Sequence, residues 1–272
     1  MRKIHMLVGC LLTIMLAVLP PAACVAADNS AVDAAKAFAR TEAWKIINAG
    51  LADSATVAVL DDEVTVYAEG FGMADRLQSL PVDKNTLFNI GSISKVYVAT
   101  AIMLLVDDGK VNLDASAVTY LPEFTMLDER YKDITVRMLL NHSSGLPGTV
   151  GPNSFGYQYN TEIYREVLDI LAHSHLKSQP GELAPYCNDG FTLAEMIVAK
   201  VSGMSYIDFL QQRIFAPLAL KYTGTGVADR PEKNLLVAKR YTKAGKALPL
   251  EALSLLGSGG LSATAEDLCR FA

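Results

Sequence analysis

The sequence predicts an α+β protein, in which a short antiparallel hairpin near the N-terminus is followed by a largely helical region. Two observations lead to this prediction. β-Branched runs at 56–60 and 64–68 are joined by three acidic residues, which is typical of a hairpin. An almost continuously apolar segment at 96–106 is too short to span a membrane and predicts a helix buried on all sides. With 272 residues, of which 51% are hydrophobic, the chain can form one sizeable core.

Residues 1–27 have the pattern of an export signal. Two basic residues precede an apolar run at 7–19, and small residues lead up to Ala27. Because such a run is too short to cross a bilayer comfortably, we expect cleavage after Ala27 and no membrane span in the remaining chain. The protein is therefore expected to be periplasmic or secreted. Cys24 leaves open an alternative in which the exported protein is a lipoprotein.

The other elements follow from local patterns. Apolar residues at helical spacing predict a first helix over 31–49 that ends at Gly50. A short apolar run at 86–90 precedes the buried helix. Thr264 and the acidic residues after it predict a last helix, within which we expect the chain to break off. Shorter helices are predicted in the middle of the chain at 135–140, 161–172, 192–201 and 206–215.

Charge and cysteine content narrow the possible functions. The net charge is −5, and removal of the leader takes away two basic residues and no acidic one, so 22 − 29 gives −7. An acidic chain is poorly suited to general nucleic-acid binding, which needs a basic face. Beyond the leader only Cys187 and Cys269 remain, too few for a disulfide framework, although one bond between them stays open.

The strongest chemical signal is Ser92 with Lys95, at the start of the predicted buried helix. Three residues apart, the two side chains lie on one helix face, and the hydroxyl lies near unpaired backbone N–H groups. A helix N-terminus stabilises developing negative charge, and a lysine kept from water beside a serine can accept its proton. By itself a Ser-x-x-Lys pair also arises by chance, so further features must support a nucleophile here.

A second signal is Tyr186-Cys187-Asn188, in a loop before the helix predicted near Thr192. A tyrosine in such a loop can shuttle a proton, and an asparagine two residues on can donate to a substrate carbonyl. Cys187 is expected to point away from its neighbours and to be a small buried filler rather than a reactive thiol.

Together these segments resemble the serine β-lactamase and penicillin-binding protein family, most closely its class C β-lactamase, D-alanyl-D-alanine carboxypeptidase and esterase branch. The resemblance runs from about Thr56 to Ala272. Besides the two motifs it includes the segments 139–147, 180–188 and 259–268. It implies a β-lactamase/transpeptidase-like fold, with an antiparallel sheet flanked by helices and a mostly helical lobe, formed here by residues 28–272.

The resemblance also implies roles. Ser92 would be the acylated nucleophile, Lys95 and Tyr186 would move its proton, and Asn188 would bind the substrate. The substrate would be a β-lactam, a D-alanyl peptide of the kind found in peptidoglycan, or a small ester, and no cofactor or metal is implied. The family's Lys-Thr-Gly-type segment does not follow Gly260, and its closing strands are missing. We therefore expect weak or no activity from this chain alone.

Alternative interpretations remain. A penicillin-binding or sensor module without catalysis would keep the same fold, and so would a relic that is not acylated at all. Clustered His173 and His175 lack convergent partners for zinc and suit a helix end. His142 could suggest a Ser-His-Asp triad, but the chain has no Gly-x-Ser-x-Gly elbow, and the resemblance places this histidine in a structural turn. The sequence leaves the oligomeric state open.

Overall fold

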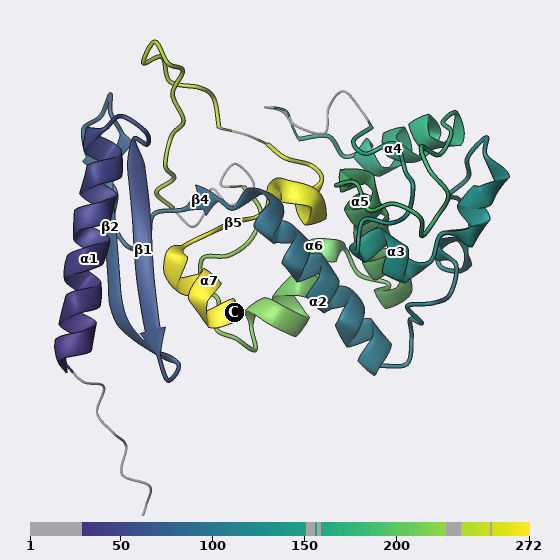
Figure 1. Cartoon of the computed structure of the whole chain (residues 1–272), viewed down its shortest axis with the longest axis horizontal. Helices are drawn as coiled ribbons and strands as arrows, with labels where there is room; N and C mark the ends of the chain where they lie inside the picture. Colours follow the sequence, from purple (N-terminus) through teal and green to yellow (C-terminus); the bar gives the residue numbers. More distant parts are fainter. Residues whose placement is uncertain (1–28, 151–155, 157–158, 227–234, 251) are drawn as a thin grey trace, which may run out of the picture.

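A computed structural model describes residues 29–150, 156, 159–226, 235–250 and 252–272. The predicted leader, 1–27, lies outside the described residues. A helix-covered hairpin stands at one end of the molecule and a mostly helical lobe at the other, with short strands and a helix between them (Figure 1). The α+β prediction is confirmed.

The hairpin consists of β1 (Ser54–Asp61) and β2 (Val64–Asp75), which pair antiparallel. Strand β3 (Leu80–Pro81) pairs with the other edge of β2, so the order is β1-β2-β3. The turn residues Asp62 and Glu63 have φ values of 45° and 65°. Positive φ at both positions matches the right-handed twist of a two-residue hairpin turn.

Both strands are longer than predicted, and β2 continues well beyond 68. The β-branched run that predicted this strand stops at Ala68, two residues before Gly70. The structure shows instead that Gly70 lets the backbone of a neighbouring segment come close, since a Cβ atom there would lie 2.6 Å from the carbonyl oxygen of Val82. The glycine therefore allows close packing inside the strand rather than ending it.

The predicted first helix is α1 (Asn29–Asn48), and it packs on the hairpin. Trp44 meets Phe71 edge to face with ring centroids 5.9 Å apart, and Phe71 is buried in a small core of its own. Helix α7 (Ala265–Phe271) contacts β1 from the side that faces the helical lobe (Figure 1). As predicted, Thr264 caps it by accepting from the backbone of Asp267.

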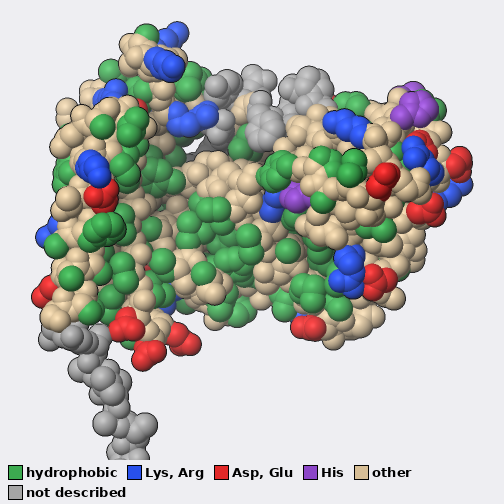
Figure 2. Space-filling view, viewed as in Figure 1, with side chains coloured by type: hydrophobic (Ala, Val, Ile, Leu, Met, Phe, Trp, Pro, Cys, Tyr) green, Lys and Arg blue, Asp and Glu red, His purple; other side chains and the backbone are tan. Residues whose placement is uncertain are grey.

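The predicted buried helix is α2 (Ser94–Asp107), preceded by the 3₁₀ turn η1 (Gly91–Ile93). One face carries Tyr97, Ile102 and other buried residues of the main core. The prediction of burial on all sides is wrong, because Val96 and Met103 are about half exposed. Figure 2 shows hydrophobic side chains gathered over α7 and the adjoining part of α2. Among the described residues, the neighbours of Val96 and Met103 cover that face of the helix only in part.

The middle region is helical, as predicted. Helix α5 (Asn188–Ser202) begins four residues earlier than expected, so Asn188 lies at its first position. Its first turn packs tightly, since a Cβ atom on Gly190 would lie 2.8 Å from the carbonyl oxygen of Leu139. No helix within the described part of the chain is long and apolar enough to cross a bilayer. The remaining helices are α3 (Val136–Leu140), α4 (Ile163–Ala172), α6 (Tyr206–Leu210), η2 (Ala117–Thr119), η3 (Glu129–Asp133) and η4 (Gln211–Phe215).

One tight turn near the C-terminus was not predicted. The segment η7 (Leu256–Gly260) is buried against α2 and α5, and it leads into β5 (Ser262–Ala263). Strand β5 pairs antiparallel with β4 (Phe88–Asn89), which directly precedes η1. This pairing places the segment that follows η7 beside the start of α2.

Candidate active site

Ser92 lies in η1, where β4 passes into α2. The side chain of Asn89 shapes this entrance: its Oδ1 accepts from the backbone of Gly91 at 3.0 Å, and its Nδ2 donates to the carbonyl of Gly259 at 3.0 Å. Gly91 has φ of 51°, which suits glycine. Hydrogen bonds of Asn89 therefore hold the turn that carries the exposed Ser92, one within the turn and one to η7.

Lys95 follows one turn later and is 6% exposed. Its Nζ atom lies 3.3 Å from Ser92 Oγ and donates to Asn188 Oδ1 at 2.7 Å. The carbonyl oxygen of Ser258 in η7 is its third partner. The ammonium also lies over the rings of Tyr186 and Phe191, 4.8 Å and 5.5 Å from their centroids. A buried lysine is thus held on every side by acceptors and aromatic faces.

Tyr186 reaches the same point from the loop before α5. Its hydroxyl hydrogen-bonds to Ser92 Oγ at 2.5 Å, although the side chain as a whole is 57% exposed. The ring of His142 lies beside it, with centroids 4.6 Å apart, and His142 Nδ1 accepts the backbone N–H of Cys187 at 3.0 Å. His142 therefore supports the loop that carries the phenol.

Asn188 is fixed at both ends of its amide. Its Oδ1 accepts from Lys95, and its Nδ2 donates to Thr149 Oγ1 at 2.8 Å. The loop that carries Thr149 is held by Asp189, whose carboxylate accepts from the backbone of Gly148 and Val150, each at 2.8 Å. Burial raises the pKa of Asp189, and these two hydrogen bonds oppose the rise.

All four residues predicted for the site come together around Ser92 Oγ and Lys95 Nζ. Three others were not assigned a role from the sequence: Asn89, the carbonyl of Ser258, and Glu195, described below. The glycine-rich run at 257–260 was the available signal for a tight turn. It could not indicate which carbonyl would face the lysine, because that depends on packing between distant segments.

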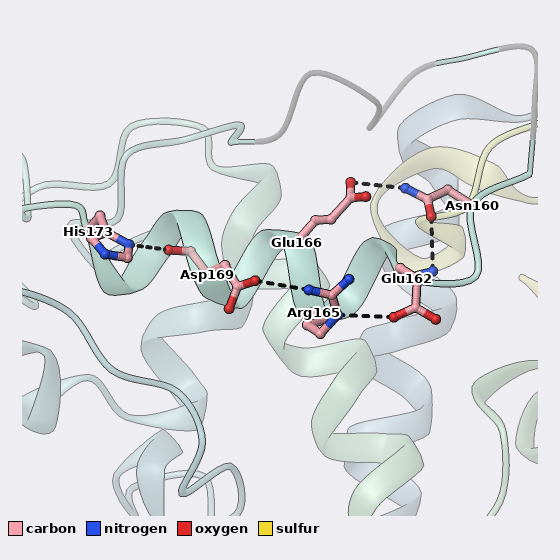
Figure 3. A network of polar contacts seen from close by, with 6 residues as sticks. All are labelled: Asn160, Glu162, Arg165, Glu166, Asp169 and His173. Carbon is pink, nitrogen blue, oxygen red and sulfur yellow. Dashed lines mark hydrogen bonds and ion pairs between the residues drawn. The ribbon is translucent and has the colours of Figure 1, made fainter.

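Cys187 is buried, as predicted, and burial raises the pKa of its thiol. Cys269 is also a free thiol, so the disulfide bond that the sequence left open is not formed between the two cysteines. His173 ends α4, where its Nδ1 hydrogen-bonds to the carbonyl of Asp169 at 2.8 Å (Figure 3). In the described part of the chain no group of three His, Cys, Asp or Glu residues is arranged to hold a metal ion.

A cavity of about 500 Å³ lies next to the site rather than in it. Its wall includes Asn89 and Gly260 together with the segments 237–241 and 248–250. Ser92 and Lys95 are not part of that wall, so the cavity borders the turn that carries Ser92 without including the two side chains.

His142 gives the site a specific pH dependence. Burial and the nearby Lys95 lower the pKa of His142 from its ordinary 6.5. Because Nδ1 accepts a hydrogen bond, only the neutral ring supports Cys187. The stability that this contact contributes is present above pH 6.5 and is lost as the pH falls through the lowered pKa. We expect the wild-type protein to lose about 1 kcal/mol, one hydrogen bond, by this route in acid.

The matched variant is His142→Asn, since asparagine tolerates the residue's positive φ of 67° and offers an oxygen acceptor that does not titrate. The measurement is the free energy of unfolding of both proteins from pH 7.5 to pH 5, taken as their difference at each pH. The difference is needed because Glu195 titrates in the opposite sense, as its raised pKa makes stability fall when the pH rises through about 7. A difference that stays constant with pH would contradict the assignment.

Comparison with known proteins shows the family to which a chain with this site belongs. A family model described as beta-lactamase matches residues 45–272. The chain belongs to the β-lactamase family. Among solved structures, this β-lactamase-family chain superposes on a beta-lactamase/D-alanine carboxypeptidase from Pseudomonas syringae with a TM-score of 0.74 and 26% identity, covering 89% of this chain and 64% of that one. A class C beta-lactamase in complex with cefoxitin gives a TM-score of 0.75 and 25% identity, covering 90% and 65%. The predicted β-lactamase/transpeptidase-like fold is confirmed.

Curated relatives agree with this assignment. Penicillin-binding protein 4* of Bacillus subtilis strain 168 is 32% identical over 171 residues, 62% of this chain and 37% of that protein. The beta-lactamase of Yersinia enterocolitica is 28% identical over 221 residues, 76% and 53%. The chain thus spans about a third to a half of the length of the curated relatives it matches.

Proposed function

We propose that this β-lactamase-family protein is a serine hydrolase that forms an acyl-enzyme on Ser92. The observation that supports this most directly is the convergence of Lys95 Nζ and the Tyr186 hydroxyl on Ser92 Oγ, at 3.3 Å and 2.5 Å. A nucleophile within hydrogen-bond reach of two groups that can exchange protons is the arrangement that acyl transfer requires.

The hydrogen bonds of Lys95 specify how it would act. A neutral amine has two N–H donors and one lone pair. Asn188 Oδ1 and the Ser258 carbonyl can only accept, so together they take up both donors. In the neutral amine, the lone pair would then be left to face Ser92 Oγ, 3.3 Å away. Lys95 would receive the serine proton in this way, while the Tyr186 hydroxyl, which also contacts Ser92 Oγ, would pass a proton to the leaving group.

The proposed reaction has two stages, acylation of Ser92 and hydrolysis of the resulting ester. Ser92 Oγ attacks the substrate carbonyl carbon, and the proton of the serine hydroxyl passes to Lys95. The attack forms a tetrahedral intermediate. Collapse breaks the C–N or C–O bond, and the proton passes by way of Tyr186 to the departing amine or alcohol. Water then attacks the carbonyl carbon of the ester and gives a proton to Lys95. The bond from that carbon to Ser92 Oγ breaks, Ser92 Oγ takes the proton back, and the acid is released. The backbone N–H of Ser92 would supply one hydrogen bond to the oxyanion.

The substrate class we propose is a β-lactam, a D-alanyl peptide or a small ester. The names of the relatives support the first two, since they include beta-lactamases, penicillin-binding proteins and a D-alanine carboxypeptidase. We also propose that the protein is exported by its leader, from the basic residues and apolar run at its start.

Labelling with a fluorescent penicillin tests the function. We expect a covalent adduct on the tryptic peptide 85–95, which contains both Ser92 and the buried Ser94. Fragment ions should place the adduct on Ser92. The rate of release then separates turnover from stable capture by a binding or sensor module. An adduct on another residue, or no adduct with penicillin, a D-alanyl thioester or a short-chain activated ester, would overturn the proposal.

A further inference from the structure

The Ser258 carbonyl that accepts from Lys95 lies in η7, a turn without regular backbone pairing to a sheet. Two surface-side contacts hold the turn. Asn89 donates to the Gly259 carbonyl, and the backbone of Asn160 donates to Ser254 Oγ at 2.8 Å, just before the turn. Asn160 also accepts from Glu162 and donates to Glu166, which ties it to the start of α4 (Figure 3).

A third contact comes from inside the core. Glu195, on α5, is fully buried, and its Oε2 accepts the backbone N–H of Gly257 at 2.7 Å. Its Oε1 accepts from the hydroxyl of Tyr164 at 2.5 Å. Gly257 is packed so closely that a Cβ atom would lie 2.3 Å from Val98 Cγ2 and 3.0 Å from Glu195 Oε2. The turn is thereby clamped between a carboxyl group and the helix that carries Lys95.

A buried carboxyl group is costly for the fold. Burial raises the pKa of Glu195 to about 7, although hydrogen bonds from Tyr164 and from the backbone of Gly257 and Leu256 oppose the rise. The hydroxyl of Tyr206, which interacts electrostatically with Glu195, is buried and has no hydrogen-bond partner among the described residues. An apolar residue would avoid this cost. The neutral acid keeps one carbonyl oxygen, so the contact with Gly257 persists in either protonation state.

From these contacts we infer that Glu195 is a positioning residue for the site: by holding the N–H of Gly257, it directs the adjacent Ser258 carbonyl at Lys95. The inference rests on the proposed function for its catalytic meaning. Glu195 does not touch Ser92 or Lys95 and acts only through the turn. When the carbonyl is displaced, one N–H of Lys95 loses its acceptor, and the lone pair is no longer fixed toward Ser92.

The variants that test this are Glu195→Leu, which keeps the bulk and removes the acceptor, and Glu195→Gln, which keeps an oxygen for Gly257 and an amide for Tyr164. Tyr164→Phe removes the other partner of Glu195 and leaves its contact with Gly257 in place. In case Glu195→Leu does not fold, Gly257→Ala displaces the same turn from its other side, by the close approach to Val98.

Two readouts do not depend on activity. Hydrogen exchange of peptides covering 255–261 reports on the turn, and the rate of reductive methylation of Lys95, followed by mass spectrometry, reports on its amine. In Glu195→Leu and in Gly257→Ala we expect both rates to rise about tenfold, as loss of a buried hydrogen bond allows local opening. In Glu195→Gln and Tyr164→Phe we expect rates within about twofold of wild type.

The third readout is acylation of Ser92, resolved into probe affinity and the acylation rate constant. Glu195→Leu should lower the rate constant about 10- to 100-fold at unchanged affinity, as expected for a misdirected proton acceptor, and Glu195→Gln should restore it. Unchanged exchange and methylation in folded Glu195→Leu would overturn the inference, as would equal effects of the Gln and Leu variants. If wild-type protein is not acylated, the proposed function fails, while the first two readouts still decide the role of Glu195.

Discussion

Replacing Ser92 with alanine is expected to abolish covalent labelling by penicillin and to lower the acylation rate by about 10⁴-fold or more. The reason is that Ser92 Oγ is the atom on which both Lys95 and Tyr186 converge. Ser92 is exposed in a 3₁₀ turn and packs into no core, so its loss should leave the fold intact. The measurement is the second-order rate constant for labelling, together with the melting temperature.

The matched control is Ser94→Ala, two residues further along. Ser94 has the same functional group, but it is buried and its Oγ accepts from the backbone of Leu261 at 3.1 Å. This variant should lose stability, since the amide of Leu261 is left without its acceptor, and should still be labelled. Labelling that persists in Ser92→Ala and disappears in Ser94→Ala would show that the nucleophile has been assigned to the wrong residue.

Lys95→Met is expected to lower the acylation rate by about 10³-fold, within the range that general acid–base groups contribute. Methionine has a similar length and suits a site that is 6% exposed, so the variant should fold. It leaves Asn188 Oδ1 and the Ser258 carbonyl without a donor, which should cost about 1–3 kcal/mol of stability. Kinetics and unfolding measured on the same preparation separate the two effects.

Lys95→Arg distinguishes a proton acceptor from a fixed positive charge. A guanidinium stays protonated and cannot accept the serine proton, although it can still donate to the same acceptors. We expect Lys95→Arg to be as slow as Lys95→Met. An arginine variant that retains more than about a tenth of the wild-type rate would mean that Lys95 acts through its charge alone, and the proposed proton path would have to be abandoned.

The site shows which contacts local sequence patterns can predict and which they cannot. The spacing of Ser92 and Lys95 predicted their contact, because a separation of one turn is decided by backbone geometry alone. The motif at 186–188 was recognised from the sequence. Its distance from Ser92 could not be predicted, since that distance depends on where α5 packs. Asn89, Ser258 and Glu195 remained unassigned because their roles lie in backbone contacts, and any asparagine, serine or glutamate can make such contacts.

The same division holds for the fold. The hairpin was predicted from its β-branched runs, helix α2 from its continuous apolar segment and helix α1 from the helical spacing of its apolar residues, and all of these are local patterns. The full length of β2 and the early start of α5 were missed, since Gly70 packs against Val82 and Gly190 against Leu139, and a local pattern does not show such contacts. The exposed face of α2 was also missed, since hydropathy shows that a helix is apolar and does not show what covers it.

The sequence by itself determined which groups are capable of chemistry and the order in which they occur, because residue type and short spacing are properties of the chain. The tertiary structure decided the rest. Lys95 meets Asn188 across 93 residues and Ser258 across 163, and such contacts exist only once helix, turn and core have packed together. Packing therefore determines which groups surround Lys95 Nζ, and with them how the amine lies relative to Ser92 Oγ.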